Sequence, residues 1–158
     1  MTAPSPAPVK LQDKDIEDYG VIGNLETCAL VARDASIDWL CFPFLESPSL
    51  FGALLDSEKG GRFHVRPAGE FVSRQAYNSA TNVLTSSFES ASGAAVLTDF
   101  MPVKGVTDQG PLRALYRKLA CTQGEVEAEA LFDPRPDYAA ADASVELLEG
   151  GALCSWGG

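Results

Sequence analysis

Residues 27–43 decide the fold of this chain, and they read Thr27-Cys28-Ala29-Leu30-Val31-Ala32-Arg33-Asp34-Ala35-Ser36-Ile37-Asp38-Trp39-Leu40-Cys41-Phe42-Pro43. Two apolar runs on either side of a short polar turn are typical of two antiparallel strands. With Asp34-Ala35 as a two-residue loop, one face of the pair is wholly apolar and consists of Cys28, Leu30, Ala32, Ile37, Trp39 and Cys41. A one-residue slip would bring Ser36 and Asp38 onto that face. We therefore predict the first register, with Ala35 at positive φ at a cost of about 1 kcal/mol.

This register makes Cys28 and Cys41 direct neighbours across the two strands. Opposed residues of a non-hydrogen-bonded pair have Cα atoms about 4.5 Å apart, which lies within the range that a disulfide spans. The N-terminus has neither the basic segment nor the apolar segment of an export signal. We therefore expect a cytoplasmic location, where thiols stay reduced, and two buried cysteines that behave as small apolar side chains.

Short apolar or alternating runs, separated by Gly, Pro, Asn, Asp and Ser, continue along the rest of the chain. One helical turn is expected over 49–56, with Ser49 as its cap. A second hairpin is expected around a three-residue loop at 91–93, which would pair Phe88 with Val96 and Leu84 with Phe100. We predict an all-β fold, an antiparallel β-sandwich of the super-β-sandwich type with at most one short helix near 49–56. The candidate strands are residues 27–33, 37–43, 62–66, 70–77, 82–89, 95–101, 112–121, 125–132, 145–148 and 152–156.

The composition is that of one compact domain. The 158 residues are 46% hydrophobic and 22% charged, and a chain of this length buries enough surface to fold without metal or disulfide support. Three prolines among the first eight residues predict a disordered Pro-rich leader over 1–14, followed by a single β-sandwich domain over 15–158. The net charge of −10 disfavours nucleic acid and anionic membranes as partners, and no apolar run is long enough to span a membrane.

Residues for catalysis or metal binding are scarce. His64 is the single histidine, and the four cysteines form no C-x-x-C pair, so we expect no metal site and no cofactor. His64 is expected to be a partly buried structural imidazole. Carboxylates are abundant, but Glu125, Glu127 and Glu129 alternate along one strand and indicate a solvated face.

Several motifs, in collinear order over residues 16–138, resemble the opening of bacterial and archaeal glycoside hydrolase family 15 proteins, the glucoamylase and trehalase relatives. They include Phe132-Asp133-Pro134-Arg135-Pro136-Asp137-Tyr138. The other matching segments are residues 16–24, 27–43, 47–51, 54–56, 60–63, 81–84 and 97–102. The family's usual Pro-Arg-Phe-Asp-Ser-Pro-Ser reads here Pro43-Phe44-Leu45-Glu46-Ser47-Pro48-Ser49, so an aromatic side chain replaces a five-donor guanidinium.

The resemblance implies an N-terminal trehalase-like β-sandwich that packs on a catalytic α/α barrel in cis. The chain has no long helical periodicity, so we expect the barrel, with the two glutamates of its inverting mechanism, to be absent from it, and the sandwich to be truncated at its C-terminus. The chain alone is then expected to be inactive, while the parent polypeptide is a glycoside hydrolase for α-glucosides such as trehalose or maltooligosaccharides.

Four residues are candidates for contact with the sugar: Asn24, Asp38, Trp39 and Glu46. Core packing of Trp39 and turn or surface roles for the other three are the alternatives. A stand-alone carbohydrate-binding module, with Phe42, Phe44, Tyr77 or Trp156 as stacking aromatics, is the competing function, and an autonomous hydrolase is a third.

An apolar surface is also predicted over 43–55, where Phe44, Leu45, Leu50 and Phe51 crowd together. In the parent protein it would face the barrel. In the chain by itself it would promote self-association.

Overall fold

Twelve strands and one short 3-10 helix make up the part of the chain that the structure describes, residues 14–103 and 113–157 of a computed structural model. The predicted leader, residues 1–13, lies outside this part. Lys14, which the sequence places in the leader, belongs to the fold and is tied to it by ion pairs. The strands are β1 (Tyr19–Gly23), β2 (Cys28–Ala32), β3 (Ser36–Cys41), β4 (Ser49–Phe51), β5 (Arg62–Pro67), β6 (Phe71–Tyr77), β7 (Leu84–Ser90), β8 (Gly93–Phe100), β9 (Tyr116–Gly124), β10 (Ala128–Asp133), β11 (Ala143–Leu148) and β12 (Gly151–Trp156).

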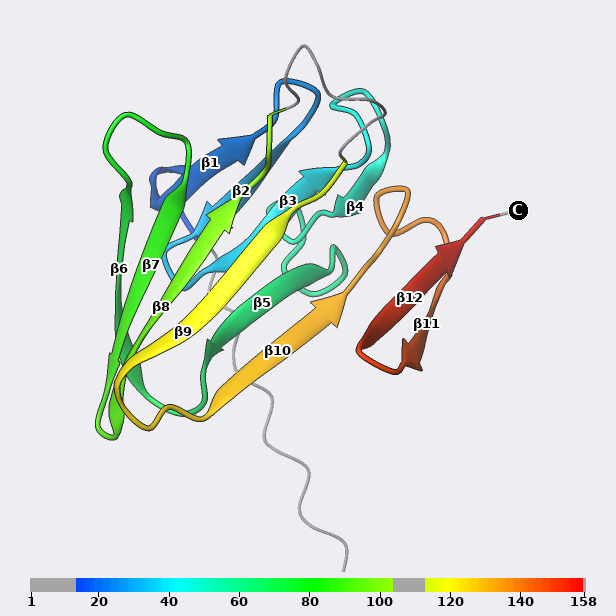
Figure 1. Cartoon of the computed structure of the whole chain (residues 1–158). Coiled ribbons are helices and arrows are strands. Elements are labelled where there is room, and N and C mark those ends of the chain that lie inside the picture. Colours follow the sequence, from blue (N-terminus) through cyan, green and yellow to red (C-terminus); the bar gives the residue numbers. More distant parts are fainter. Residues whose placement is uncertain (1–13, 104–112, 158) are drawn as a thin grey trace, which may run out of the picture.

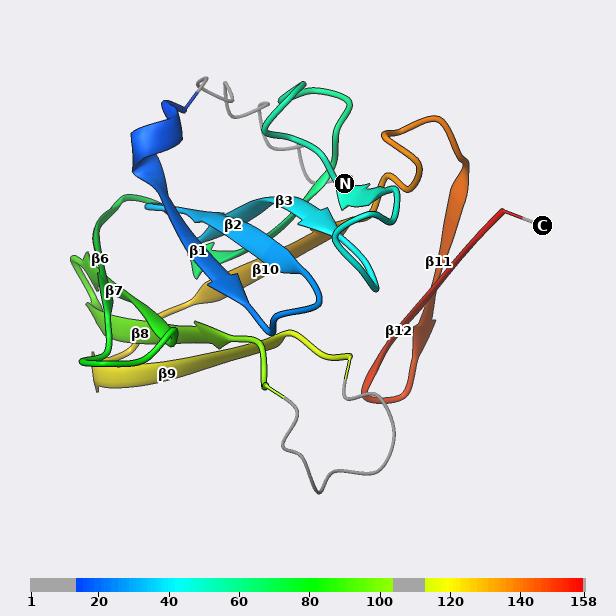
Figure 2. The same cartoon turned by 90° about the horizontal axis from the view of Figure 1, so that it is seen from above.

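The strands form two facing antiparallel sheets and a separate hairpin (Figure 1). The first sheet has the order β1-β2-β3-β5-β10, with β4 added on β3, and the second has the order β6-β7-β8-β9. Figure 2 shows the two sheets as layers, with the β11–β12 hairpin off to one side. The predicted antiparallel β-sandwich is therefore confirmed.

The core lies between the two sheets. Ile22, Val31 and Ile37 of the first sheet pack with Leu84 of the second, and a smaller cluster around Phe88 and Leu97 extends the core toward the β7–β8 turn. Both clusters contain side chains from both layers, because in each sheet the apolar residues of the alternating pattern point toward the other sheet.

The first hairpin keeps the predicted register away from its turn and loses it near the turn. Leu30 faces Trp39 as predicted, but Val31 faces Ile37, because Asp38 is an extra residue in β3. The loop has three residues, and Ala35 has a φ of 66°, the positive value that was predicted. The face toward the core is formed by Ala29, Val31, Ile37 and Leu40, so Ile37 is the one residue of the predicted apolar face that lies in the core cluster. Both faces of this hairpin are covered, and alternation by itself does not tell them apart.

The second hairpin was predicted one residue out of register. Phe88 faces Ala95 and Leu84 faces Asp99, across a two-residue turn. The inward face therefore contains a fully buried carboxylate, that of Asp99, where the sequence pattern favoured Phe100. Arg117 of β9 neutralises this carboxylate and makes the observed register possible.

Two local predictions fail outside the hairpins. Residues 49–51 form the strand β4 and are followed by turns, so the helix expected near 49–56 is wrong; the helical segment is the 3-10 turn Ile16–Asp18. The strand β1 was not predicted, because it is short and contains two glycines. All five residues of β1 pair with β2, and this pairing stabilises a strand that its own residues do not favour.

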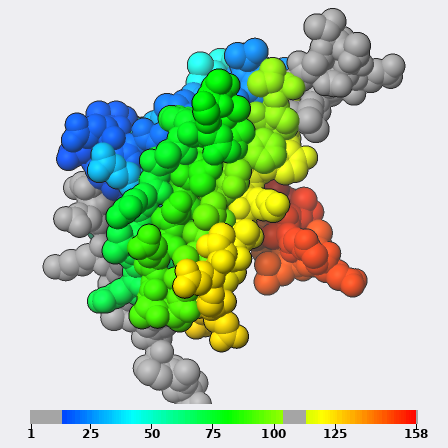
Figure 3. All heavy atoms as spheres, turned by 60° about the vertical axis from the view of Figure 1, so that its left-hand side comes forward, coloured from blue at the N-terminus to red at the C-terminus, as the bar shows by residue number. Residues whose placement is uncertain are grey.

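The apolar surface predicted over 43–55 is only partly present. Leu45 and Leu55 are exposed, but Phe51 is core and Leu50 packs against the core. The exposed apolar side chains gather instead on the β11–β12 hairpin. In its register, one face consists of Ala143, Val145, Leu147, Ala152, Cys154 and Trp156. Val145, Leu147 and Trp156 of this apolar hairpin face are exposed, and Figure 3 shows the hairpin standing away from the sandwich.

Candidate functional site

The outer face of the first sheet carries the most concentrated polar chemistry of the described residues, and breaks in strand pairing create it. The extra residue in β3 turns both Asp38 and Trp39 away from the core, since Ile37 and Leu40 on either side point inward. A second irregularity pairs Ser49 of β4 with Cys41. Bulges of this kind re-aim side chains and are common beside functional sites.

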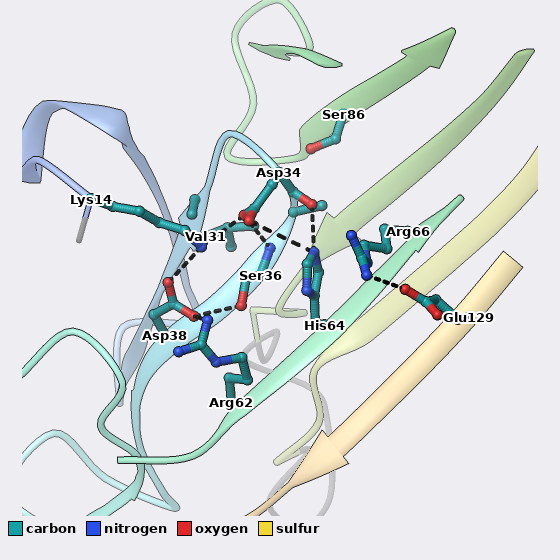
Figure 4. Close-up of polar contacts among 12 residues, drawn as sticks. Lys14, Val31, Asp34, Ser36, Asp38, Arg62, His64, Arg66, Ser86 and Glu129 are labelled. Atoms are coloured by element: carbon teal, nitrogen blue, oxygen red, sulfur yellow. Dashed lines mark hydrogen bonds and ion pairs between the residues drawn. The ribbon is translucent and has the colours of Figure 1, made fainter. Parts of the chain in front are cut away.

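Asp38 is the centre of a buried polar network on this face (Figure 4). One carboxylate oxygen accepts hydrogen bonds from Lys14 Nζ and Tyr19 Oη, both at 2.9 Å. The other accepts from the hydroxyl of Ser36 and lies 3.8 Å from the Arg62 guanidinium. The side chain is 2% exposed, so its charge is paired and satisfied within the protein.

The pKa values in this network follow from burial and charge. Burial, followed by the negative charge of Asp38, raises the pKa of Tyr19 above its ordinary value, which keeps the phenol as a donor. Burial pushes the pKa of Asp34 upward, but the charge of Lys14, the charge of His64 and hydrogen bonds outweigh it and hold that pKa below 3.8. The network beside Lys14, Tyr19 and Arg62 leaves a small hollow of about 270 Å³.

His64 lies next to this network and is a partly buried structural imidazole, as predicted. Its Nε2 donates to the backbone carbonyl of Asp34 at 3.0 Å, and its side chain is 14% exposed. Burial lowers the pKa of His64 below 6.5, although the neighbouring Asp34 offsets part of this effect. The imidazole is therefore neutral at pH 7 and holds the β2–β3 turn in place.

A larger hollow, of about 370 Å³, lies between loop 52–60 and the segment 135–139. The ring of Tyr138 packs against Trp39, with ring centroids 6.4 Å apart. Ser49 lines the hollow, and its hydroxyl oxygen is buried without a hydrogen-bond partner among the described residues. The backbone amide of Arg135 donates to the carbonyl of Leu50 at 2.9 Å, which fixes the segment 135–139 against β4. We name this cavity the Ser49 hollow.

The structure separates the four predicted sugar-contact residues. Asp38 and Trp39 lie together on β3, where Trp39 is half-buried. Asn24 lies in the β1–β2 turn, and its side-chain oxygen accepts from the amides of Glu26 and Thr27. Glu46 is exposed in the turn before β4, which is joined to the β1–β2 turn by a bond between the backbones of Leu45 and Glu26. Their contact with a sugar stays a prediction.

Sequence reasoning missed Lys14, Tyr19 and Arg62, because a buried carboxylate reveals its partners only in three dimensions. Ser49 and Tyr138 lie in motifs that the resemblance singled out, but nothing in those motifs indicates that they flank one hollow. The four aromatics considered for stacking do not form a platform: Tyr77 lies on β6, Trp156 on β12, and Phe42 and Phe44 are half-buried in a loop.

The two thiols of the first hairpin are neighbours. The β2–β3 pairing ends at Ala29–Leu40, so Cys28 and Cys41 are the next residue of each strand beyond the last pair. Burial, and then the neighbouring Cys28, raise the pKa of the Cys41 thiol. Among the described residues, no three His, Cys, Asp or Glu side chains come together to hold a metal ion, and no helix there is long and apolar enough to cross a membrane.

The described residues form an antiparallel β-sandwich with a buried polar network on one outer face and a hairpin with an exposed apolar face. The family described as "Trehalase-like, N-terminal" matches residues 11–155, and the chain belongs to this family. The resemblance found in the motifs is therefore confirmed.

Similar proteins carry the name trehalase. This chain is 46% identical to Trehalase 1 of Sulfolobus acidocaldarius over 89 residues, which are 56% of this chain and 15% of the relative. It is 39% identical to a trehalase of Thermoplasma volcanium over 60% of this chain and 16% of the relative. It is 27% identical to a trehalase of Mycobacterium tuberculosis over 87% of this chain and 22% of the relative. The chain thus spans about a fifth or less of these relatives. No solved structure matches it.

Proposed function

We propose that this chain is the non-catalytic N-terminal domain of a glycoside hydrolase family 15 enzyme that cleaves an α-glucosidic bond, with trehalose as its substrate. The domain packs on a catalytic α/α barrel of the same polypeptide. Support comes from the family match over residues 11–155 and from relatives that are named trehalases and are several times longer than this chain.

The observation that carries the proposal is the apolar hairpin face. Leu147 is 83% exposed and Val145 and Trp156 are each 45% exposed, although all three lie on one face of the β11–β12 pair. An isolated two-stranded hairpin is marginally stable in water, and a contiguous exposed apolar face marks a surface that is covered in the working protein. The length of the relatives makes the remainder of the same polypeptide the natural covering partner.

The polar network favours a structural rather than a catalytic role for Asp38. Both oxygens of this carboxylate are already occupied by Lys14, Tyr19 and Ser36. A general base or acid for glycoside hydrolysis needs a free oxygen beside the scissile bond and a second carboxyl group at a set separation. On this proposal Asp38 is not one of the catalytic pair, which belongs to the barrel.

The test measures glucose release. The purified 158-residue chain is expected to release none from trehalose or maltooligosaccharides. A chimera in which this chain replaces the matching N-terminal region of Trehalase 1 from Sulfolobus acidocaldarius is expected to hydrolyse trehalose. The remainder of that relative, without an N-terminal domain, is expected to be inactive. Glucose release by the chain itself, in proportion to its concentration and abolished by substitution of one of its carboxylates, would overturn the proposal.

A further inference from the structure

The Ser49 hollow contains a polar group that the protein leaves unsatisfied. Ser49 is 1% exposed, and its hydroxyl oxygen has no hydrogen-bond partner among the described residues. A buried hydroxyl without a partner destabilises the fold, because its desolvation is not offset by a hydrogen bond. Every other buried side-chain oxygen or nitrogen in the described part of the chain has a partner. The hydroxyl of Ser49 is therefore set up to bond to something that enters the hollow.

The charges around the hollow cancel. Two carboxylates, Asp56 and Glu58, line it together with two cations, Lys59 and Arg135. The carboxylate of Asp56 accepts hydrogen bonds from the backbone amides of Glu58 and Lys59 and so fixes the loop. Arg135 forms an ion pair with Asp133 at 2.8 Å. The lining therefore offers donors and acceptors without the net positive charge that an anion needs. They suit a neutral ligand with many hydroxyl groups better than an anion.

An aromatic ring stands at the same hollow. Tyr138 is 57% exposed. It is the middle residue of three consecutive residues with positive φ, at 54°, 56° and 65° for Asp137, Tyr138 and Ala139. Such a backbone conformation is strained for residues other than glycine, and strain of this kind persists only where the surrounding structure holds the segment in place. The turn holds the ring beside the hollow and against Trp39.

We propose that the Ser49 hollow binds a neutral sugar, with a sugar hydroxyl bonded to the hydroxyl of Ser49 and a face of the sugar ring against Tyr138. Hydrogen bonds from a few fixed polar groups, combined with one aromatic surface, are the usual means by which a concave site selects its ligand. The choice of an α-glucoside as the sugar rests on the proposed function. This site uses none of the residues Asn24, Asp38 and Glu46, and it involves Trp39 only as the support of Tyr138.

The close approach at Gly52 provides a blocking variant. A Cβ atom at Gly52 would lie 3.5 Å from the hydroxyl oxygen of Ser49 and 3.6 Å from the carbonyl oxygen of Gly60, which are ordinary contacts. Gly52 is not among the glycines with positive φ, so Gly52→Ala introduces a methyl group without backbone strain. Gly52→Ala therefore reduces the space beside the hydroxyl while the fold is kept.

The experiment is a calorimetric titration of the 158-residue chain with trehalose, maltose and glucose, and separately with inorganic phosphate. Binding of at least one sugar is expected in the millimolar range, with no binding of phosphate. Ser49→Ala, Tyr138→Ala and Gly52→Ala are each expected to weaken sugar binding about tenfold or more, the equivalent of one hydrogen bond or one packed ring. Tyr116→Ala is the matched control, since Tyr116 is similarly exposed but lies on β9.

Stability separates a ligand site from a structural one. Ser49→Ala removes an unsatisfied hydroxyl, so its melting temperature is expected to equal or exceed that of the unsubstituted chain while its sugar affinity falls. The proposal is overturned if no sugar binds up to 100 mM. It is equally overturned if phosphate binds in place of sugar, or if Ser49→Ala and Gly52→Ala, folded by circular dichroism, bind sugar as the unsubstituted chain does. Failure here leaves the hydrolysis test of the chimera unaffected, so the two proposals fail separately.

Discussion

Two buried aspartates show how single residues hold this sandwich together. Asp38 is neutralised on the outer face of the first sheet by Lys14 and Arg62. Asp99 lies inside, where both of its oxygens accept from Arg117, at 2.8 and 3.0 Å. Arg117 also donates to the carbonyl of Phe63, at 2.7 Å, and to that of Ala35, both in the opposite sheet or its turns. One guanidinium therefore pairs a buried charge and joins the two layers.

Arg117→Met is predicted to lower the free energy of unfolding by about 3–5 kcal/mol, because it leaves the Asp99 carboxylate buried and unpaired. Chemical denaturation followed by circular dichroism measures this loss. Arg33→Ala is the control: its partner is Asp18 and its side chain is 65% exposed, so a change within about 0.5 kcal/mol is expected. The double variant Asp99→Leu/Arg117→Met should recover part of the loss. A loss for Arg117→Met no greater than that for Arg33→Ala would show that the pair does not stabilise the fold.

His64 predicts how stability depends on pH. Its pKa is lowered in the folded protein by burial, so the unfolded chain binds more protons in the interval below pH 6.5. The free energy of unfolding should therefore fall as the pH decreases from about 6.5 toward the lowered folded-state pKa. His64→Gln, whose amide can still donate to the carbonyl of Asp34, should flatten this part of the profile. Asp34 acts in a separate window: its lowered pKa stabilises the fold above about pH 3.8, and this stability is lost as the pH falls below that value toward the lowered folded-state pKa. An unchanged slope between pH 6.5 and 5 in His64→Gln would contradict the assignment.

At the scale of elements, irregular pairing and tight turns place the site. The extra residue in β3 turns Asp38 and Trp39 outward, and loop 52–60 folds back so that the amide of Ala53 donates to the carbonyl of Gly61 at 3.1 Å. Gly61 has a φ of +68° at the entry to β5. The segment that carries Arg135 passes directly over it. Loop and segment together form the walls of the Ser49 hollow.

Gly61→Ala is predicted to destabilise the protein by several kcal/mol. Its Cβ would meet the carbonyl oxygen of Asp133 at 2.3 Å and Cγ of Arg135 at 2.4 Å, in addition to the strain of a positive φ. Gly69→Ala is a matched control, because Gly69 has a φ of +79° but nothing within 4 Å of the added carbon. Thermal unfolding should show a loss of about 1 kcal/mol for Gly69→Ala and a clearly greater one for Gly61→Ala. Equal losses of stability would mean that the segment carrying Arg135 moves away from the added carbon at no cost.

At the scale of the whole molecule, the two sheets of the sandwich bury apolar side chains against each other, whereas the β11–β12 hairpin leaves its apolar face exposed. The two sheets share one core, and hydrogen bonds from Arg117 to the carbonyls of Phe63 and Ala35 join the layers. The hairpin stands apart in both views of the chain and presents the apolar hairpin face to solvent (Figure 1, Figure 2). This asymmetry separates the part of the domain that folds on itself from the part that we assign to contact with the catalytic barrel.

The 158-residue chain is predicted to self-associate through the apolar hairpin face. Leu147→Glu should reduce light scattering at high concentration and the binding of an apolar-surface dye, with no loss of melting temperature, since Leu147 is 83% exposed. Leu153→Glu places the same charge on the opposite face of the hairpin and should have a smaller effect, because Leu153 faces Glu146. A chain that stays monomeric and binds no dye before any substitution would refute this prediction.

The sequence by itself determined the β class, ten of the twelve strands and the family, because period-two alternation and turn residues are local properties and the motifs are contiguous in the chain. It also placed Ala35 at positive φ. Only the tertiary structure decided which face of each hairpin points inward. Alternation marks two faces without saying which is covered, and the buried charge of Asp99 is tolerated only because Arg117 reaches it from the next strand. The Ser49 hollow was likewise beyond the sequence, since its walls come from segments about 80 residues apart that meet only when the first sheet is complete.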